Sequence, residues 1–75
     1  MVADRGCCAR KHVDNRTGWY VDVYVNRSYV GVVGPYGDLY PYVCEGSELL
    51  GDAEGTPYYW GPITSTCGGN WLLND

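Results

Sequence analysis

Phenylalanine is absent from this 75-residue chain, and no apolar run approaches the 18 residues from which a membrane-spanning helix is built. Only five residues are Lys or Arg, against nine Asp or Glu, so the net charge is −4. Binding to phosphates depends on clustered positive charge, which this chain lacks. We therefore expect neither a membrane-spanning protein nor one that binds nucleic acid.

Helix-compatible segments are also missing. The eleven Gly and four Pro interrupt the chain so often that no dozen residues are both free of them and apolar at helical spacing. The apolar residues between these interruptions are mostly β-branched or aromatic, which favours strands. We expect one all-β domain over residues 1–75, with residues 1–7 as a candidate disordered arm.

The predicted fold is a small antiparallel β-sandwich or barrel of six to eight short strands with essentially no helix. A chain of this size buries a thin core and often needs a disulfide or a partner subunit. The expected strands occupy residues 8–14, 20–25, 29–33, 39–44, the start of 47–56, 58–60, 63–67 and the closing segment after Gly69.

The clearest signal is the hairpin "WYVDVYVNRSYVGVV" over residues 19–33. Alternation places three valines of its first strand on the core face and Tyr20, Asp22 and Tyr24 on the other. Tyr29 on the return strand could join this outward tyrosine pair. The turn falls at Asn26-Arg27, where arginine disfavours the positive φ of a tight type I′ turn.

Within this hairpin, "VYVNRSYVG" resembles the "VYVDGxYVG" hairpin of PEGA-type and related small immunoglobulin-like β-domains of bacterial envelope or extracellular proteins. Asn26-Arg27 stands where those domains carry Asp-Gly. The segments "YYWGP" and "GGNWLLN" also look like late strands of small secreted bacterial β-domains. The resemblance implies a β-fold and a location outside the cytoplasm, in the envelope or extracellular, and supplies no catalytic residue.

Four cysteines are candidates for disulfide bonds: Cys7, Cys8, Cys44 and Cys67. Neighbours in a strand point to opposite faces, so the first two should take separate partners or one should stay free. Three pairings are open. A bridge to either of the later cysteines would close a long loop and add roughly 3–4 kcal/mol of stability.

Catalytic and metal chemistry have weak support. The single histidine, His12, has no serine motif around it, and the carboxylates at residues 45, 48, 52 and 54 also fit an ordinary acidic loop. A zinc site could use Cys8, His12, Cys44 and Cys67, although close Cys-x2-Cys pairs are missing. We expect no enzyme, no cofactor and no metal; a small Cys/His metal-binding domain is the second alternative.

Aromatic residues are the most distinctive feature. Eight Tyr and three Trp make up 15% of the chain, and these residue types favour half-wet surfaces. We predict a non-enzymatic interaction module that binds itself or another protein through edge strands and an outward aromatic face. Carbohydrate binding by the same face, with Asp22, Asp38 or Asn70 as polar anchors, is the alternative. The predicted binding residues are Tyr20, Tyr24, Tyr29, Tyr58, Tyr59 and Trp60.

Overall fold

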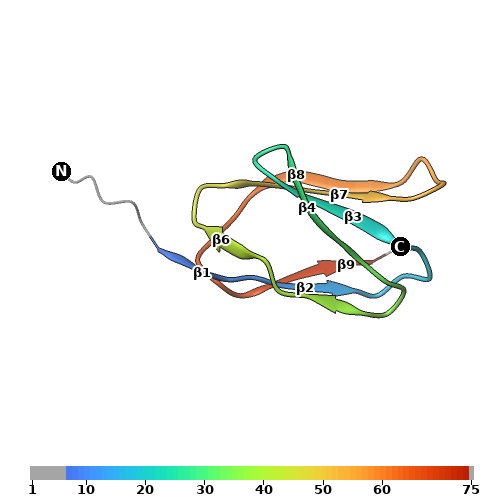
Figure 1. The fold of residues 1–75 in the computed structure, drawn as a ribbon, viewed down its shortest axis with the longest axis horizontal. Coiled ribbons are helices and arrows are strands. Elements are labelled where there is room, and N and C mark those ends of the chain that lie inside the picture. The colour runs from blue at the N-terminus through green and yellow to red at the C-terminus, as the bar shows by residue number, and fades with distance from the viewer. Residues whose placement is uncertain (1–6, 75) are drawn as a thin grey trace.

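Nine short strands and no helix make up residues 7–74, which are the part of the chain that the computed structural model describes (Figure 1). The predicted all-β domain is thereby confirmed, and the arm predicted over 1–7 lies, apart from Cys7, outside the described residues. The strands are β1 (Cys8–Arg10), β2 (His12–Asn15), β3 (Val21–Val25), β4 (Ser28–Val33), β5 (Asp38–Leu39), β6 (Tyr42–Cys44), β7 (Glu48–Ala53), β8 (Tyr59–Thr64) and β9 (Asn70–Leu73).

Two sheets face each other as the layers of a small sandwich (Figure 1). One has the strand order β4-β3-β7-β8, and the other has the order β5-β2-β9. A third, two-stranded sheet of β1 and β6 lies at one end of the sandwich. Since no described element is a helix, none is long and apolar enough to cross a membrane.

The structure has nine strands where eight segments were expected, because two of the expected strands are each divided in two while those expected over 58–60 and 63–67 are joined as β8. The strand expected over 8–14 breaks at Lys11, and the one expected over 39–44 breaks at Tyr40 and Pro41. The Lys11 N–H donates to the Pro41 carbonyl at 2.9 Å, so the two breaks lie against each other. Proline has no N–H to donate to a neighbouring strand. At these two breaks both segments of the chain pass from the two-stranded to the three-stranded sheet.

The hairpin of β3 and β4 forms as predicted, including a tight turn that arginine was expected to disfavour. Asn26 and Arg27 have φ of 51° and 69°, the positive values that a type I′ turn requires. The start of β7 holds this turn in place. The Asn26 N–H donates to the Glu48 carbonyl at 2.8 Å, and the Glu48 N–H donates to Asn26 Oδ1 at 3.0 Å.

Strand β8 corrects another prediction, because it runs through Gly61-Pro62 instead of stopping there. It lies at the sheet edge, where a missing N–H can face away from the neighbouring strand. The register with β7 shifts between Leu49 and Gly51, so a bulge accommodates the proline. The closing strand β9 pairs with β2 in parallel, with His12 opposite Asn70, whereas the sequence analysis expected an antiparallel fold throughout.

Branched aliphatic side chains from both sheets fill the core. The prediction that valines of β3 face inward holds fully for the first two, whereas Val25 is only half-buried. Buried hydrophobic residues are Val13, Val21, Val23, Val33, Val43, Leu49, Ala53, Trp71 and Leu73.

The fully buried side-chain amide of Asn15 links β2 to the loops that contain Trp19 and Gly34. Asn15 Nδ2 donates to the carbonyls of Trp19 at 2.8 Å and Gly34 at 2.9 Å, with a longer contact to Val33 at 3.3 Å. Its Oδ1 accepts from both the N–H and the hydroxyl of Thr17. Every polar atom of this side chain is therefore satisfied inside the protein, as burial requires.

All four cysteines are disulfide-bonded, which confirms them as disulfide residues. Cys7 pairs with Cys67, and Cys8 pairs with Cys44, its cross-strand neighbour on β6. The adjacent cysteines thus take separate partners. Such bonds are typical of oxidising compartments outside the cytoplasm.

Candidate functional site

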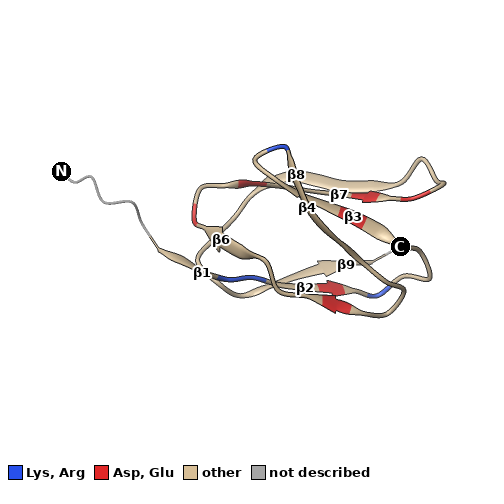
Figure 2. Cartoon of the chain, viewed as in Figure 1, with Lys and Arg blue, Asp and Glu red and all other residues tan. Residues whose placement is uncertain are grey.

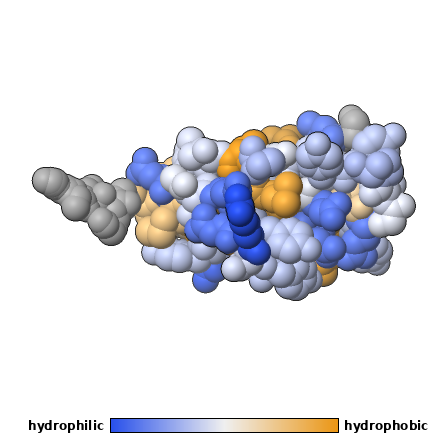
Figure 3. Space-filling view, turned by 90° about the horizontal axis from the view of Figure 1, so that it is seen from above, coloured by the Kyte–Doolittle hydropathy of each residue, from blue (hydrophilic) through white to orange (hydrophobic). Residues whose placement is uncertain are grey.

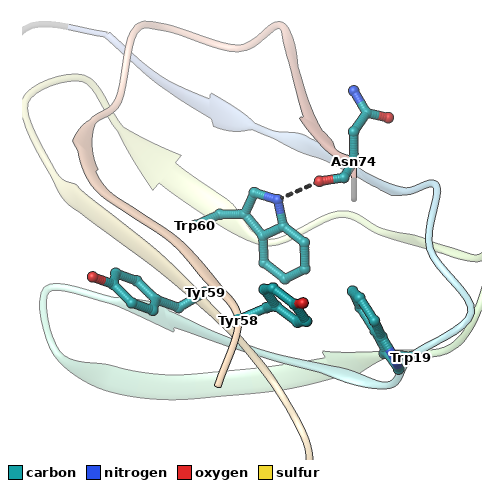
Figure 4. Close-up of a pocket in the computed structure, with 5 residues that line it drawn as sticks. All are labelled: Trp19, Tyr58, Tyr59, Trp60 and Asn74. Atoms are coloured by element: carbon teal, nitrogen blue, oxygen red, sulfur yellow. Dashed lines mark hydrogen bonds between the residues drawn. The ribbon is translucent and has the colours of Figure 1, made fainter. Parts of the chain in front are cut away.

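Aromatic rings line a hollow of about 530 Å³ beside β8 and the end of β9 (Figure 4). The rings of Trp19 and Tyr58 stack with centroids 5.1 Å apart and an interplanar angle of 19°. Trp60 donates its indole N–H to the Asn74 carbonyl at 2.9 Å. Tyr59 completes the lining and is 65% exposed. Two indoles and two phenol rings therefore border one solvent-accessible hollow.

Two segments supply these rings, and the C-terminal segment adds Asn74. Asn15 fixes the loop that carries Trp19 by binding its carbonyl, while β8 supplies Tyr59 and Trp60. The second indole packs against Gly51 on β7, since a Cβ there would lie in ordinary contact with Trp60 Cε3 at 3.5 Å. The hollow thus depends on core packing on one side and on the C-terminal segment on the other.

Only half of the predicted binding residues meet at this hollow. Tyr58, Tyr59 and Trp60 line it, together with two residues that the sequence analysis did not select, Trp19 and Asn74. Trp19 stood beside the predicted hairpin, so its residue type was a usable signal. Asn74 accepts the indole hydrogen bond of Trp60 through its backbone carbonyl, a contact that no sequence pattern predicts.

The remaining three predicted tyrosines lie elsewhere. Tyr24 and Tyr29 face each other across the hairpin in an edge-on arrangement, with ring centroids 5.8 Å apart, as the prediction of a cross-hairpin pair required. Tyr29 is exposed, and Tyr24 beside it is half-buried. Tyr20 is exposed and precedes β3, with its ring edge close to Gly34.

Apolar side chains gather on the outer face of the four-stranded sheet. Seen from above in Figure 3, an apolar patch lies in the middle of this face and is bordered by hydrophilic side chains. Val30 and Val32 on the edge strand β4 are 42% and 41% exposed. Val32 lies opposite Asp22 on β3, so this face combines exposed valine with a neighbouring carboxylate.

Acidic residues mark both sheets (Figure 2). On β3 and β7, Asp22 lies opposite Asp52, and Glu54 follows just beyond. The hydrogen bond with Asp22 raises the pKa of the Glu54 carboxyl above its usual 4.5, helped by loss of solvation and by the charges of both aspartates. The outer face of this sheet therefore concentrates negative charge.

A second polar cluster lies on the outer face of the three-stranded sheet. His12 Nε2 is 2.7 Å from Asp38 Oδ1, and His12 Nδ1 is 3.0 Å from Asn70 Oδ1. The Tyr40 ring stacks on the imidazole with centroids 4.9 Å apart. The hydrogen bond with Asp38 is the main cause that raises the pKa of His12 above its usual 6.5. The polar residues expected as sugar anchors here bind the histidine instead.

The cysteine-based metal alternative loses its ligands in this structure. Zinc binds cysteine as a thiolate, and all four thiols are engaged in disulfides. The acidic residues weighed for hydrolysis also have structural partners, since Glu45 accepts the Cys7 N–H at 2.9 Å and Glu48 pairs with Arg27. No family model, curated protein or solved structure matches this chain.

Proposed function

We propose that this chain is a non-enzymatic interaction module that associates with a second copy of itself through the edge strand β4 and the adjoining outer face. The observation that carries the proposal is the uncharged, apolar composition of this edge strand. Strand β4 reads "SYVGVV", with no charge and no proline, and two of its valines are about two-fifths exposed. Edges of that composition readily pair with another strand.

The other edge of the same sheet supports this choice by contrast. Strand β8 carries Pro62, which has no N–H to offer to an added strand, whereas β4 contains no proline; both edge strands have one register irregularity against their neighbour. Antiparallel pairing of β4 with its counterpart would place the same residues on both sides of a two-fold axis. A continuous sheet of eight strands would result, with Tyr29, Val30 and Val32 near the joint.

Native mass spectrometry over a concentration series tests this proposal, with Val32→Lys as the disrupting variant. The new lysine would lie opposite Asp22, so the monomer gains a favourable cross-strand pair of opposite charges while the edge strand gains a charge that disfavours strand pairing. We expect the wild type to dimerise and Val32→Lys to remain monomeric.

Leu72→Lys is the matched control. Leu72 is 44% exposed on β9, an edge strand of the other sheet, and its cross-strand neighbour is also an aspartate, Asp14. It should dimerise like the wild type. A wild type that is monomeric at every concentration would overturn the proposal, and so would equal loss of dimer in both variants.

Carbohydrate binding is the second candidate, because the hollow offers stacked and exposed aromatic rings. Flat rings of Trp19, Tyr58 and Tyr59 can pack on the apolar face of a sugar, and Tyr hydroxyls can bond to its hydroxyls. A glycan screen read by tryptophan fluorescence tests it. Tyr58→Ala should abolish a positive response, whereas Tyr42→Ala, an equally exposed tyrosine on β6, should preserve it.

The two disulfides and the hairpin's resemblance to PEGA-type and immunoglobulin-like domains support placing the module in the cell envelope or outside the cell. Expression in an oxidising and in a reducing compartment, followed by counting of free thiols, tests this placement. Stable, fully oxidised protein only from the oxidising compartment is the expected result.

A further inference from the structure

We propose that His12, Asp14 and Asp38 form a binding site for a divalent transition-metal ion such as Zn²⁺. The site lies on the outer face of the three-stranded sheet, whereas β4 belongs to the four-stranded sheet, and it shares no residue with the aromatic hollow, so it does not depend on the proposed self-association. Its three potential ligand atoms lie within 4.8 Å of one another.

Strand register brings these side chains together. His12 and Asp14 are two apart on β2, which places them on the same face. Asp38 on β5 lies directly opposite Asp14, and Asn70 on β9 lies opposite His12. The central strand thus supplies two ligands, one neighbour supplies the third, and the other neighbour supplies a partner for the imidazole.

The imidazole is oriented toward the carboxylates before any ion binds. Asn70 Oδ1 accepts from Nδ1, which leaves Nε2 directed at Asp38, 2.7 Å away. Histidines that bind metals commonly donate the second ring N–H to such an acceptor, which fixes the ring and its tautomer. The stacked ring of Tyr40 further restricts rotation of the imidazole.

One nitrogen and two carboxylate oxygens suit Zn²⁺, with water as the fourth ligand of a tetrahedral site. Zn–N and Zn–O bonds near 2.1 Å place ligand atoms roughly 3.4 Å apart, so the three groups need only small side-chain rotations. Arg16 Nε binds Asp14 Oδ2 at 2.9 Å and leaves the other oxygen of that carboxylate for the ion. On binding, Zn²⁺ takes the place of any proton on Nε2.

Because His12 is the single histidine of the sequence, its ring can be observed directly. The experiment is a Zn²⁺ titration of ¹⁵N-labelled protein without a histidine tag, followed by ¹⁵N shifts of both ring nitrogens. We expect saturable one-to-one binding, with the large shift at Nε2 and a proton retained on Nδ1. Isothermal titration then gives the affinity of each variant.

Asp14→Asn and Asp38→Asn should each weaken Zn²⁺ binding at least tenfold, and Asn70→Ala should do so by roughly 10-fold or more through loss of ring orientation. Asp52→Asn, a carboxylate of the opposite sheet, is the matched control and should bind like the wild type. Unchanged ring shifts in the wild type would overturn the proposal without relying on any variant. Equal binding by Asp38→Asn and Asp52→Asn would overturn it too.

Discussion

Replacing Asn15 by Asp should remove a large part of the stability of this domain, although the two side chains have the same size. The amide donates to two carbonyls at 2.8 and 2.9 Å, those of Trp19 and Gly34, from a fully buried position. A carboxylate accepts from Thr17 as the amide does, but it cannot donate. Both carbonyls would then face an acceptor instead of a donor.

The expected cost follows from those two carbonyls. A buried polar group left without its partner costs about 1–3 kcal/mol, so Asn15→Asp should lower the free energy of unfolding by about 4 kcal/mol. Typical stabilities of about 0.05–0.15 kcal/mol per residue give roughly 4–11 kcal/mol for this length. The loss therefore equals the whole stability at the lower end of this range and about a third of it at the upper end. In acid the loss should shrink, because a protonated carboxyl can donate one bond.

Urea unfolding followed by far-UV circular dichroism measures this loss, with Asn74→Asp as the control. Asn74 is exposed, so the same chemical change there should alter the free energy of unfolding by less than about 0.5 kcal/mol. If Asn15→Asp costs less than about 1 kcal/mol more than this control, the reasoning from the buried amide is wrong.

Three further predictions concern the disulfides, the acidic face and the core. Cys8→Ser combined with Cys44→Ser removes the bond that closes a loop of 36 residues. Because the Cys7–Cys67 bond still restrains the unfolded chain, the free energy of unfolding in urea titrations should fall by about 3 kcal/mol, less than for an isolated loop of that length; an unchanged midpoint would contradict the chain-entropy account. The hydrogen bond with Asp22 raises the pKa of Glu54 in the folded state above its usual 4.5. The protonated carboxyl therefore stabilises the folded state at low pH, and this contribution is lost as the pH rises from about 4.5 through the folded-state pKa. Glu54→Gln should thus stabilise the protein at pH 7 and change nothing below pH 4, as thermal melts at both values would reveal. Gly51→Ala places a Cβ 3.2 Å from Val21 Cγ1, so this buried side chain must shift slightly; the crowding should offset the roughly 0.4–1 kcal/mol that replacing Gly by Ala otherwise gains, and a melting temperature raised by that full amount would contradict this.

Local patterns were sufficient to predict the fold class. The alternation of β3, the turn at residues 26 and 27 and the many Gly and Pro predicted an all-β domain, because each signal depends on neighbours in the chain. Four cysteines in a small domain likewise indicated disulfides, and the structure fixes their pairing.

Features set by distant pairing were not predictable. The hollow needs Trp19 beside Tyr58, and the histidine cluster needs Asp38 and Asn70 on either side of His12. Both depend on register between strands far apart in the chain, which composition and spacing do not determine. The breaks at residues 11 and 41 have the same origin, because they lie side by side where two distant segments of the chain pass from one sheet to another.

The parallel pairing of β2 with β9 determines when the domain can fold. His12 and Asn70 are 58 residues apart, and Trp71 and Leu73 complete a core that the earlier strands leave open. During synthesis, the emerging chain can form its central hairpin early, but the side chain of Val13 is not fully buried until β9 has left the ribosome. Sheets closed by such distant contacts fold on millisecond-to-second timescales, so the apolar face of β2 remains open to aggregation until β9 pairs with it.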